Sequence, residues 1–156
     1  MALTVEASGR VWQKANSQLS FANPAIQEAF LRLKIYLASQ KKNPDLAIFF
    51  FSEVEADVAG GTVLLAGACK LYAAYIKKEN SATDNFAWIY DDATDDTTAA
   101  NARVQFPLLV ANDEQCYINP AGLDIATGLV VTQYTAPLGT TDASNGGSGF
   151  IIAGQP

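Results

Sequence analysis

Eight short runs rich in β-branched and aromatic residues dominate the chain, and clusters of turn-forming residues separate them. The runs cover residues 46–54, 61–67, 69–78, 85–92, 102–110, 115–120, 128–135 and 149–154. Gly, Asn, Asp, Ser, Thr and Pro fill the intervals, which is typical of antiparallel strands joined by short turns. No helical pattern lies between successive runs, so a parallel sheet of strand–helix–strand units is excluded. The sequence therefore predicts an antiparallel, jelly-roll-like β-sandwich over residues 46–156.

Residues 1–45 follow a different pattern. The first 22 residues combine polar side chains with single large apolar ones and show no period of 2 or 3.6, which predicts an extended N-terminal arm. Asn23-Pro24 then supplies a cap and a first-turn proline, and one helical face would carry Ile26, Ala29, Phe30, Leu33 and Leu37. We therefore expect one short helix over residues 24–42. The alternation of apolar and polar residues over 31–37 also fits a strand, with a hairpin through residues 43–45.

The two parts of the chain carry opposite net charge. Residues 1–45 hold 6 basic and 3 acidic residues, a net charge of +3, whereas residues 46–156 hold 4 basic and 13 acidic residues, a net charge of −9. The first part also carries Trp12 and Phe21, and exposed aromatic side chains are unfavourable unless a pocket covers them. We therefore divide the chain into a docking arm with a helix, residues 1–45, and a β-sandwich domain, residues 46–156. The arm is expected to pack on its own domain or to dock on an acidic partner, unless the charge difference is ordinary variation in composition.

The composition argues against most catalytic and nucleic-acid functions. His is absent, which removes the usual general base, the Ser-His and Cys-His nucleophile pairs and every His-ligated metal site. A formal net charge of −6 disfavours binding to a phosphate backbone. No apolar run reaches the ~18 residues of a membrane span, and residues 1–10 lack the pattern of a signal peptide. We expect no enzymatic activity, no cofactor, no nucleic-acid partner and no membrane insertion.

An acidic run at residues 91–96 and two cysteines are the remaining candidate sites. Close carboxylates suit a hard cation such as calcium, but Thr97 stands where an EF-hand needs Gly, and Arg103 where it needs Glu. A solvated hairpin loop is therefore the preferred interpretation, with a calcium site as the alternative. Cys69 and Cys116 are interpreted as buried thiols, although a disulfide would form if the fold brought their α-carbons within about 7 Å.

Residues 70–135 resemble a small β-sandwich found among virion structural proteins of tailed bacteriophages. The matching elements are the segments KLYAAYIKKENSA, FAWIYDDAT with its acidic turn, FPLLVANDE, INPAGLDIATGLVVTQY and a Thr-rich stretch ending near Asp142. The resemblance implies a capsid decoration or cement protein, a homotrimer on the outer surface of the virion that binds the major capsid protein and stabilises the shell. Its capsid contacts are expected in the N-terminal segment, at Arg10, Trp12, Lys14, Phe21, Arg32 and Lys34.

Two other functions stay open at this level. A tail-fibre or receptor-binding module would bind a cell-surface glycan through its acidic face, and a neck or tail adaptor would form a ring. The number of copies per particle separates these functions, because a cement protein covers the whole shell and the other two occupy a few positions at the tail.

Overall fold

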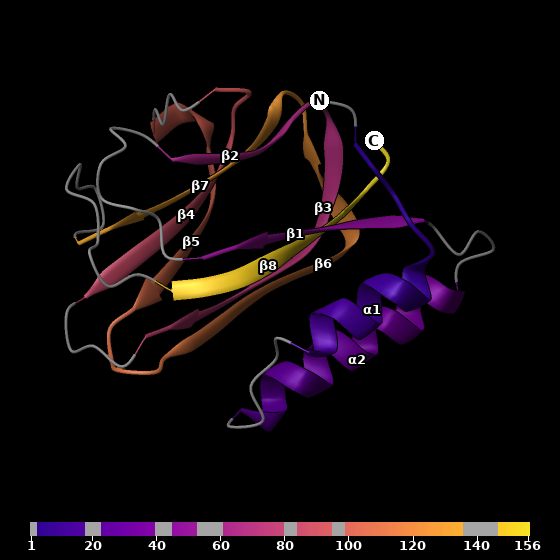
Figure 1. Ribbon diagram of the computed structural model, residues 1–156, viewed down its shortest axis with the longest axis horizontal. Helices are drawn as coiled ribbons and strands as arrows, with labels where there is room; N and C mark the ends of the chain where they lie inside the picture. Colours follow the sequence, from indigo (N-terminus) through magenta and orange to yellow (C-terminus); the bar gives the residue numbers. More distant parts are fainter. Residues whose placement is uncertain are drawn as a thin grey trace.

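The computed structural model describes residues 3–17, 23–39, 45–52, 61–79, 84–94, 99–135 and 147–156. Within these ranges the chain forms two four-stranded antiparallel sheets that pack face to face, and two helices lie against the outer side of one sheet (Figure 1). The predicted mainly-β antiparallel sandwich is therefore confirmed. The molecule has three layers, which are the helices, the sheet beneath them and the second sheet.

Each of the eight predicted runs contains a strand. Sheet A has the strand order β1-β8-β3-β6, with β1 at Leu46–Phe51, β8 at Gly147–Gly154, β3 at Cys69–Lys78 and β6 at Glu114–Ile125. Sheet B has the order β2-β7-β4-β5, with β2 at Thr62–Ala66, β7 at Gly128–Tyr134, β4 at Asn85–Asp91 and β5 at Ala102–Leu108. A 3-10 turn, Ala99–Asn101, precedes β5.

The first hydrophobic core lies between the two sheets. In β5, Val104, Phe106 and Leu108 are buried and the residues between them are exposed, as expected for an edge strand with one face on the core. In β7 all seven residues are buried, and Leu129 and Val131 belong to this core. The clear alternation of β5 and the continuous apolar run of β7 thus correspond to an edge and a central position in sheet B.

The second hydrophobic core lies between sheet A and the two helices, α1 (Ser8–Asn16) and α2 (Pro24–Ser39). Phe30 of α2 meets the ring of Phe150 edge-on with ring centroids 5.4 Å apart, and Phe150 stacks on Tyr75 at 5.5 Å. Such ring pairs add about 0.5–1.5 kcal/mol each beyond their area burial. Both faces of sheet A are therefore covered, one by sheet B and the other by the helices.

The predicted extended arm is wrong for residues 8–16, which form α1, so the described part of the chain has two α-helices where one was expected. Val11, Trp12 and Ala15 make one buried face, but nine residues show this spacing only once, and a helix this short is not stable alone. Packing on sheet A stabilises it. The helix predicted over residues 24–42 is confirmed from Pro24 to Ser39, and the alternative strand is not formed.

Two further predictions concern the C-terminal loop and the cysteines. The loop predicted at 140–149 is wrong for its last three residues, which begin β8, and 140–146 lie outside the described residues. A β-carbon at Gly149 would overlap the Tyr75 carbonyl oxygen, so glycine permits this close strand pairing. Cys69 and Cys116 are both free; the predicted buried thiol is confirmed for Cys69 in the first core, whereas Cys116 packs against the second core and is only partly buried.

Candidate docking surface

A groove runs between α1 and α2 at the end where α1 finishes and α2 begins. Its volume is about 360 Å³. Trp12 and Phe30, which are 4% and 2% exposed, line its buried side, because both belong to the second core. The described residues that line it are Trp12, Asn16, Pro24, Gln27, Glu28, Phe30, Leu31 and Lys34.

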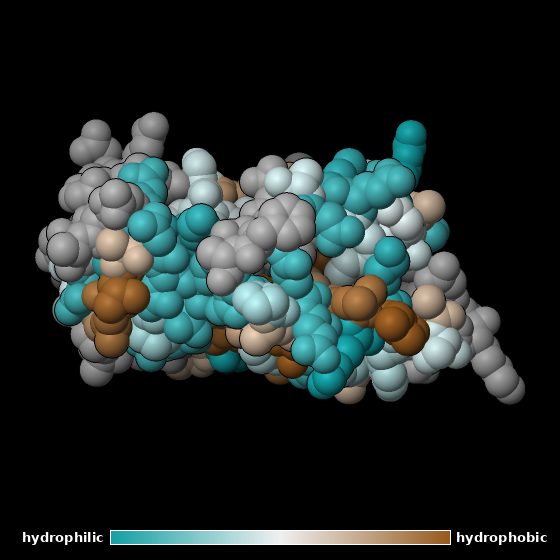
Figure 2. All heavy atoms as spheres, turned by 90° about the horizontal axis from the view of Figure 1, so that it is seen from below, coloured by the Kyte–Doolittle hydropathy of each residue, from teal (hydrophilic) through white to brown (hydrophobic). Residues whose placement is uncertain are grey.

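The side of α2 that faces away from sheet A carries large apolar side chains. Leu31, Ile35 and Tyr36 are 54%, 59% and 45% exposed, and we call these three residues the α2 ridge. Figure 2 shows the corresponding brown patch over α2. The sequence gave no sign of this ridge, because the predicted helical face was the buried one. Exposed apolar residues gathered on one helix face are typical of a binding surface.

Of the predicted contact residues, Trp12 and Lys34 line the groove. Arg10, Lys14, Arg32 and Lys34 are exposed on the helices. Lys14 forms a salt bridge with Glu6 at 2.5 Å, and Arg32 forms one with Glu28 at 2.6 Å. Trp12 is part of the second core and presents only an edge to the groove, and Phe21 lies outside the described residues.

A second exposed apolar site lies at the tip of the β5–β6 hairpin. Leu109 and Val110 are 49% and 62% exposed there. The turn is held by hydrogen bonds from the Leu109 amide to the Asp113 carboxylate at 3.3 Å and from the Asp113 amide to the Val110 carbonyl at 3.2 Å. The strand predicted over residues 102–110 ends at Leu108, so 109 and 110 belong to the tip and not to a strand. Asn112, with φ 60°, marks the turn that follows it.

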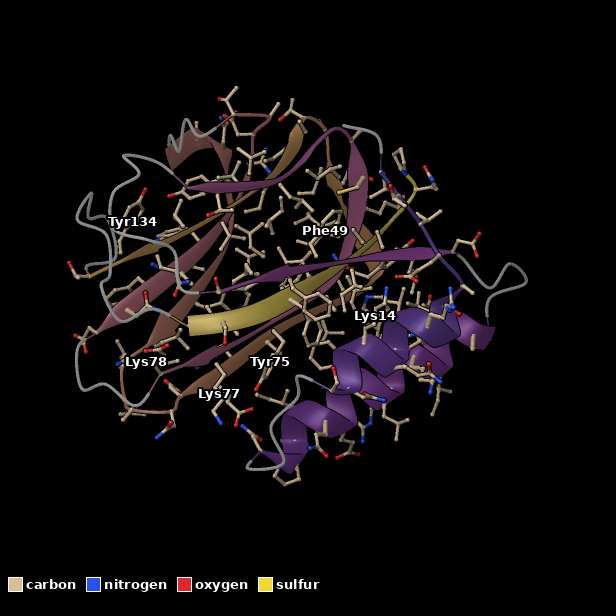
Figure 3. All side chains as sticks on the ribbon, viewed as in Figure 1. Lys14, Phe49, Tyr75, Lys77, Lys78 and Tyr134 are labelled. Carbon is tan, nitrogen blue, oxygen red and sulfur yellow. The ribbon has the colours of Figure 1, made fainter. Side chains whose placement is uncertain are left out.

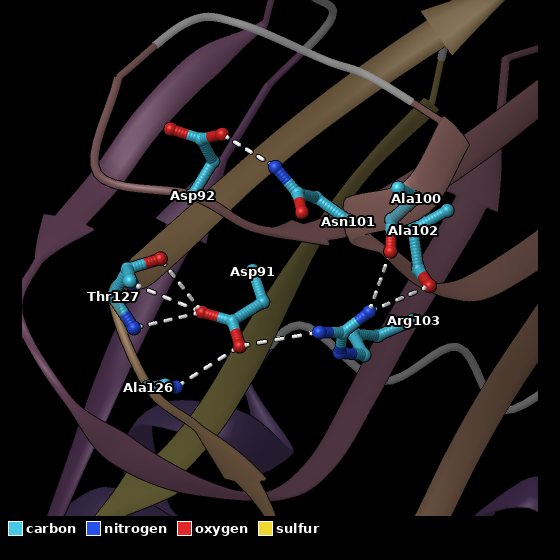
Figure 4. Close-up of polar contacts among 9 residues, drawn as sticks. Asp91, Asp92, Ala100, Asn101, Ala102, Arg103, Ala126 and Thr127 are labelled. Carbon is cyan, nitrogen blue, oxygen red and sulfur yellow. Dashed lines mark hydrogen bonds and ion pairs between the residues drawn. The ribbon is translucent and has the colours of Figure 1, made fainter.

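The acidic run has a structural role at Asp91, which is 7% exposed. Its carboxylate accepts hydrogen bonds from the backbone amides of Ala126 and Thr127 at 3.0 and 2.8 Å and from the Thr127 hydroxyl at 2.9 Å (Figure 4). Arg103 lies 3.5 Å from the same carboxylate. Burial alone would raise the pKa of Asp91, but these hydrogen bonds outweigh it and hold the pKa below its ordinary value. Asp91 thus fastens the β6–β7 turn to the end of β4.

Asp92 is likewise occupied by its neighbours. It accepts hydrogen bonds from the amide and hydroxyl of Thr94, both at 2.9 Å, and from the side chain of Asn101 at 2.9 Å. These bonds, led by the one from the Thr94 amide, lower the pKa of Asp92. No group of three potential metal ligands exists among the described residues, and Asp95 and Asp96 fall outside them. The predicted solvated loop is therefore wrong for Asp91, which ends β4 and is buried, whereas residues 92–94 leave the strand as a bend with Ala93 and Thr94 exposed.

Comparisons with protein-family models, with curated proteins and with solved structures gave no match to this chain. In the described part of the chain, neither helix is long and apolar enough to cross a lipid bilayer.

Proposed function

We propose that this protein is a non-enzymatic structural protein that decorates a viral capsid, and that its helical layer docks on the major capsid protein. The observation that supports this proposal most directly is the α2 ridge. Ile35 and Tyr36 lie on the two sides of Arg32 on the helix surface, and their side chains are 59% and 45% exposed. Binding surfaces commonly combine aliphatic and aromatic side chains with Arg in this way.

Charge supports the same face. Over residues 8–17 and 23–39 the helices carry Arg10, Lys14, Arg32 and Lys34 against the single acidic residue Glu28, a net charge of +3. The whole chain has a net charge of −6, so the helical layer is the part of the protein that an acidic partner would attract. The partner is therefore proposed to present an acidic surface around an apolar depression.

The docking mode differs from the expected arm. Residues 8–16 belong to a helix seated on sheet A, so the N-terminal segment would bind as a rigid surface. A rigid surface loses less conformational entropy on binding than a free arm. Attachment of several copies to a symmetric shell would add avidity without requiring a tight single contact.

Binding of the purified protein to empty capsids tests this proposal. Ile35→Asp should abolish co-sedimentation with the shells, because it places a charge on the α2 ridge. Val63→Asp is the matched control, since Val63 is an exposed aliphatic residue on β2, remote from the helices, and its replacement should leave binding intact. Full occupancy of the shells by the Ile35 variant, or only a few copies of the wild-type protein per particle, would contradict the proposal.

A further inference from the structure

Strand β1 forms one edge of sheet A and, among the described strands, pairs with β8 alone (Figure 1). At its first residue, Leu46, the backbone N–H and C=O both bond to Glu6, on the side away from β8. Backbone groups alternate between the two sides along a strand, and the register with β8 runs without a shift from Leu46 to Phe51. The N–H and C=O of Ile48 and Phe50 therefore also point away from β8, where no described strand pairs with them.

The side chains of β1 are apolar on both faces of the sheet. Ile48 packs against the second core, and Phe50 meets the ring of Phe150 there edge-on, with ring centroids 6.4 Å apart. Phe49 and Phe51 pack against the first core. Phe50 is nevertheless 46% exposed. The edge thus presents unpaired backbone groups between apolar side chains, and another β-strand satisfies both.

The other three edge strands carry features that hinder pairing, and β1 has none of them. A bulge lies in β2 between Val63 and Leu65. β5 carries Arg103 and Pro107, and β6 carries Pro120 together with a shift in its register with β3. β1, with the sequence LAIFFF, has no charge, no proline and no bulge. Because soluble proteins use these features to prevent edge-to-edge association, their absence from β1 indicates an edge that another strand covers.

We propose that β1 pairs with β1 of a second copy of this chain, antiparallel across a two-fold axis, so that the two copies of sheet A form one continuous sheet. Ile48 of each copy pairs with Phe50 of the other, and each such pair exchanges both of its backbone hydrogen bonds. This register uses every outward backbone group of β1 that Glu6 leaves free and keeps the Glu6–Leu46 bridge in place. It also sets Phe49 beside its own counterpart on the axis.

The sequence of β1 favours a second copy as the partner. The strand is uncharged, so no like charges meet when two copies pair. Ile48 and Phe50 lie on the same face of the sheet, so the pairing covers the exposed ring of each Phe50 with the aliphatic side chain of the other copy's Ile48. A contact made by the same patch on both copies closes as a dimer.

Light scattering on the full-length protein over a range of concentration measures the association. The wild-type protein should reach a mass of two copies. Phe50→Lys should raise the dissociation constant by about 10- to 100-fold, since it removes an apolar contact that occurs twice in the dimer and places a charge on each edge. Val110→Lys is the matched control, because Val110 is also exposed and lies in the β5–β6 hairpin, and β6 is the opposite edge of sheet A from β1. It should leave the mass unchanged.

Amide hydrogen exchange tests the register. The amide of Ile48 should be protected in the wild-type dimer and should lose this protection in Phe50→Lys. The amides of Ala47 and Phe49, which face β8, should stay protected in both proteins and are the internal control. Phe49→Cys should form a disulfide-linked dimer on oxidation, because opposite residues at such a position have α-carbons about 4.5 Å apart.

A wild-type protein that stays monomeric, a mass of three copies, a dimer unaffected by Phe50→Lys, or an Ile48 amide that exchanges freely in the dimer would overturn the inference. The docking proposal uses the outward side chains of α2 and does not involve β1. Ile35→Asp should therefore keep the dimer while losing capsid binding, so failure of the docking proposal is distinguishable from failure of this one.

Discussion

Lys78 offers the sharpest test of the packing between the sheets. It is 1% exposed, and because it follows the core residue Ile76 by two positions it points between the sheets near the end of β3 (Figure 3). Gln133 accepts from the Asn85 side chain at 2.7 Å and donates to the Gly147 carbonyl at 2.9 Å, and Gly147 is the register partner of Lys78. Among the described residues, neither the Lys78 amine nor the Asn85 side-chain oxygen has a hydrogen-bond partner.

Replacing Lys78 by Met should stabilise the protein. A buried polar group without a partner costs about 1–3 kcal/mol, and more if it is charged. Met keeps the buried stem as far as Cε, with sulfur in place of Cδ, and removes the amine. We therefore expect Lys78→Met to raise the free energy of unfolding by about 1–3 kcal/mol. For a chain of this length, that corresponds to an increase in Tm of about 2–12 °C.

Thermal and urea unfolding of Lys78→Met and Lys78→Arg would separate charge from packing. Lys78→Arg keeps a charge and adds volume, so it should lower Tm. A fall in Tm for Lys78→Met would refute the reasoning, because it would mean that the amine stabilises the sandwich through a partner such as the Asn85 oxygen. Equal effects of Met and Arg would refute it as well, since charge would then be irrelevant.

The remaining predictions concern Asp91, Cys69 and Trp12. Asp91→Asn should lower the free energy of unfolding by about 2–4 kcal/mol, because the amide leaves buried donors unpaired. Because the folded pKa of Asp91 is lowered, its carboxylate stabilises the folded protein above the unfolded pKa near 3.9, and this stabilisation is lost as the pH falls through the folded pKa. Melting curves of the wild-type protein and Asp91→Asn at several pH values would measure the loss. Burial, with a smaller effect of the Asp91 charge, raises the pKa of Cys69 to about 12, so iodoacetamide at pH 8 should modify this thiol only after unfolding. Trp12→Ala should cost about 3–5 kcal/mol by urea unfolding, whereas a negligible loss would indicate that the N-terminal segment is a free arm after all.

Local chemistry was sufficient to predict the strands. The runs of β-branched and aromatic residues, with turn residues between them, specify extended segments without reference to distant contacts, and Asn23-Pro24 does the same for the start of α2. The helical spacing of Ile26, Phe30, Leu33 and Leu37 also identified the face that is buried. Each of these signals lies within one segment, which is why the sequence alone carried them.

Contacts between distant segments decided the rest. In sheet A, β8 lies between β1 and β3. This order brings Tyr75 of β3 and Phe150 of β8 together as an aromatic surface on which the helices pack. Packing on that surface stabilises α1, whereas its three buried residues in nine give no sustained helical period in the sequence. The groove, the α2 ridge and the hairpin tip are likewise surfaces that arise when separate elements meet. The sequence by itself therefore determined the eight strands, the second helix and the charge contrast, while tertiary packing determined the first helix and every candidate docking surface, since burial depends on which segments become neighbours.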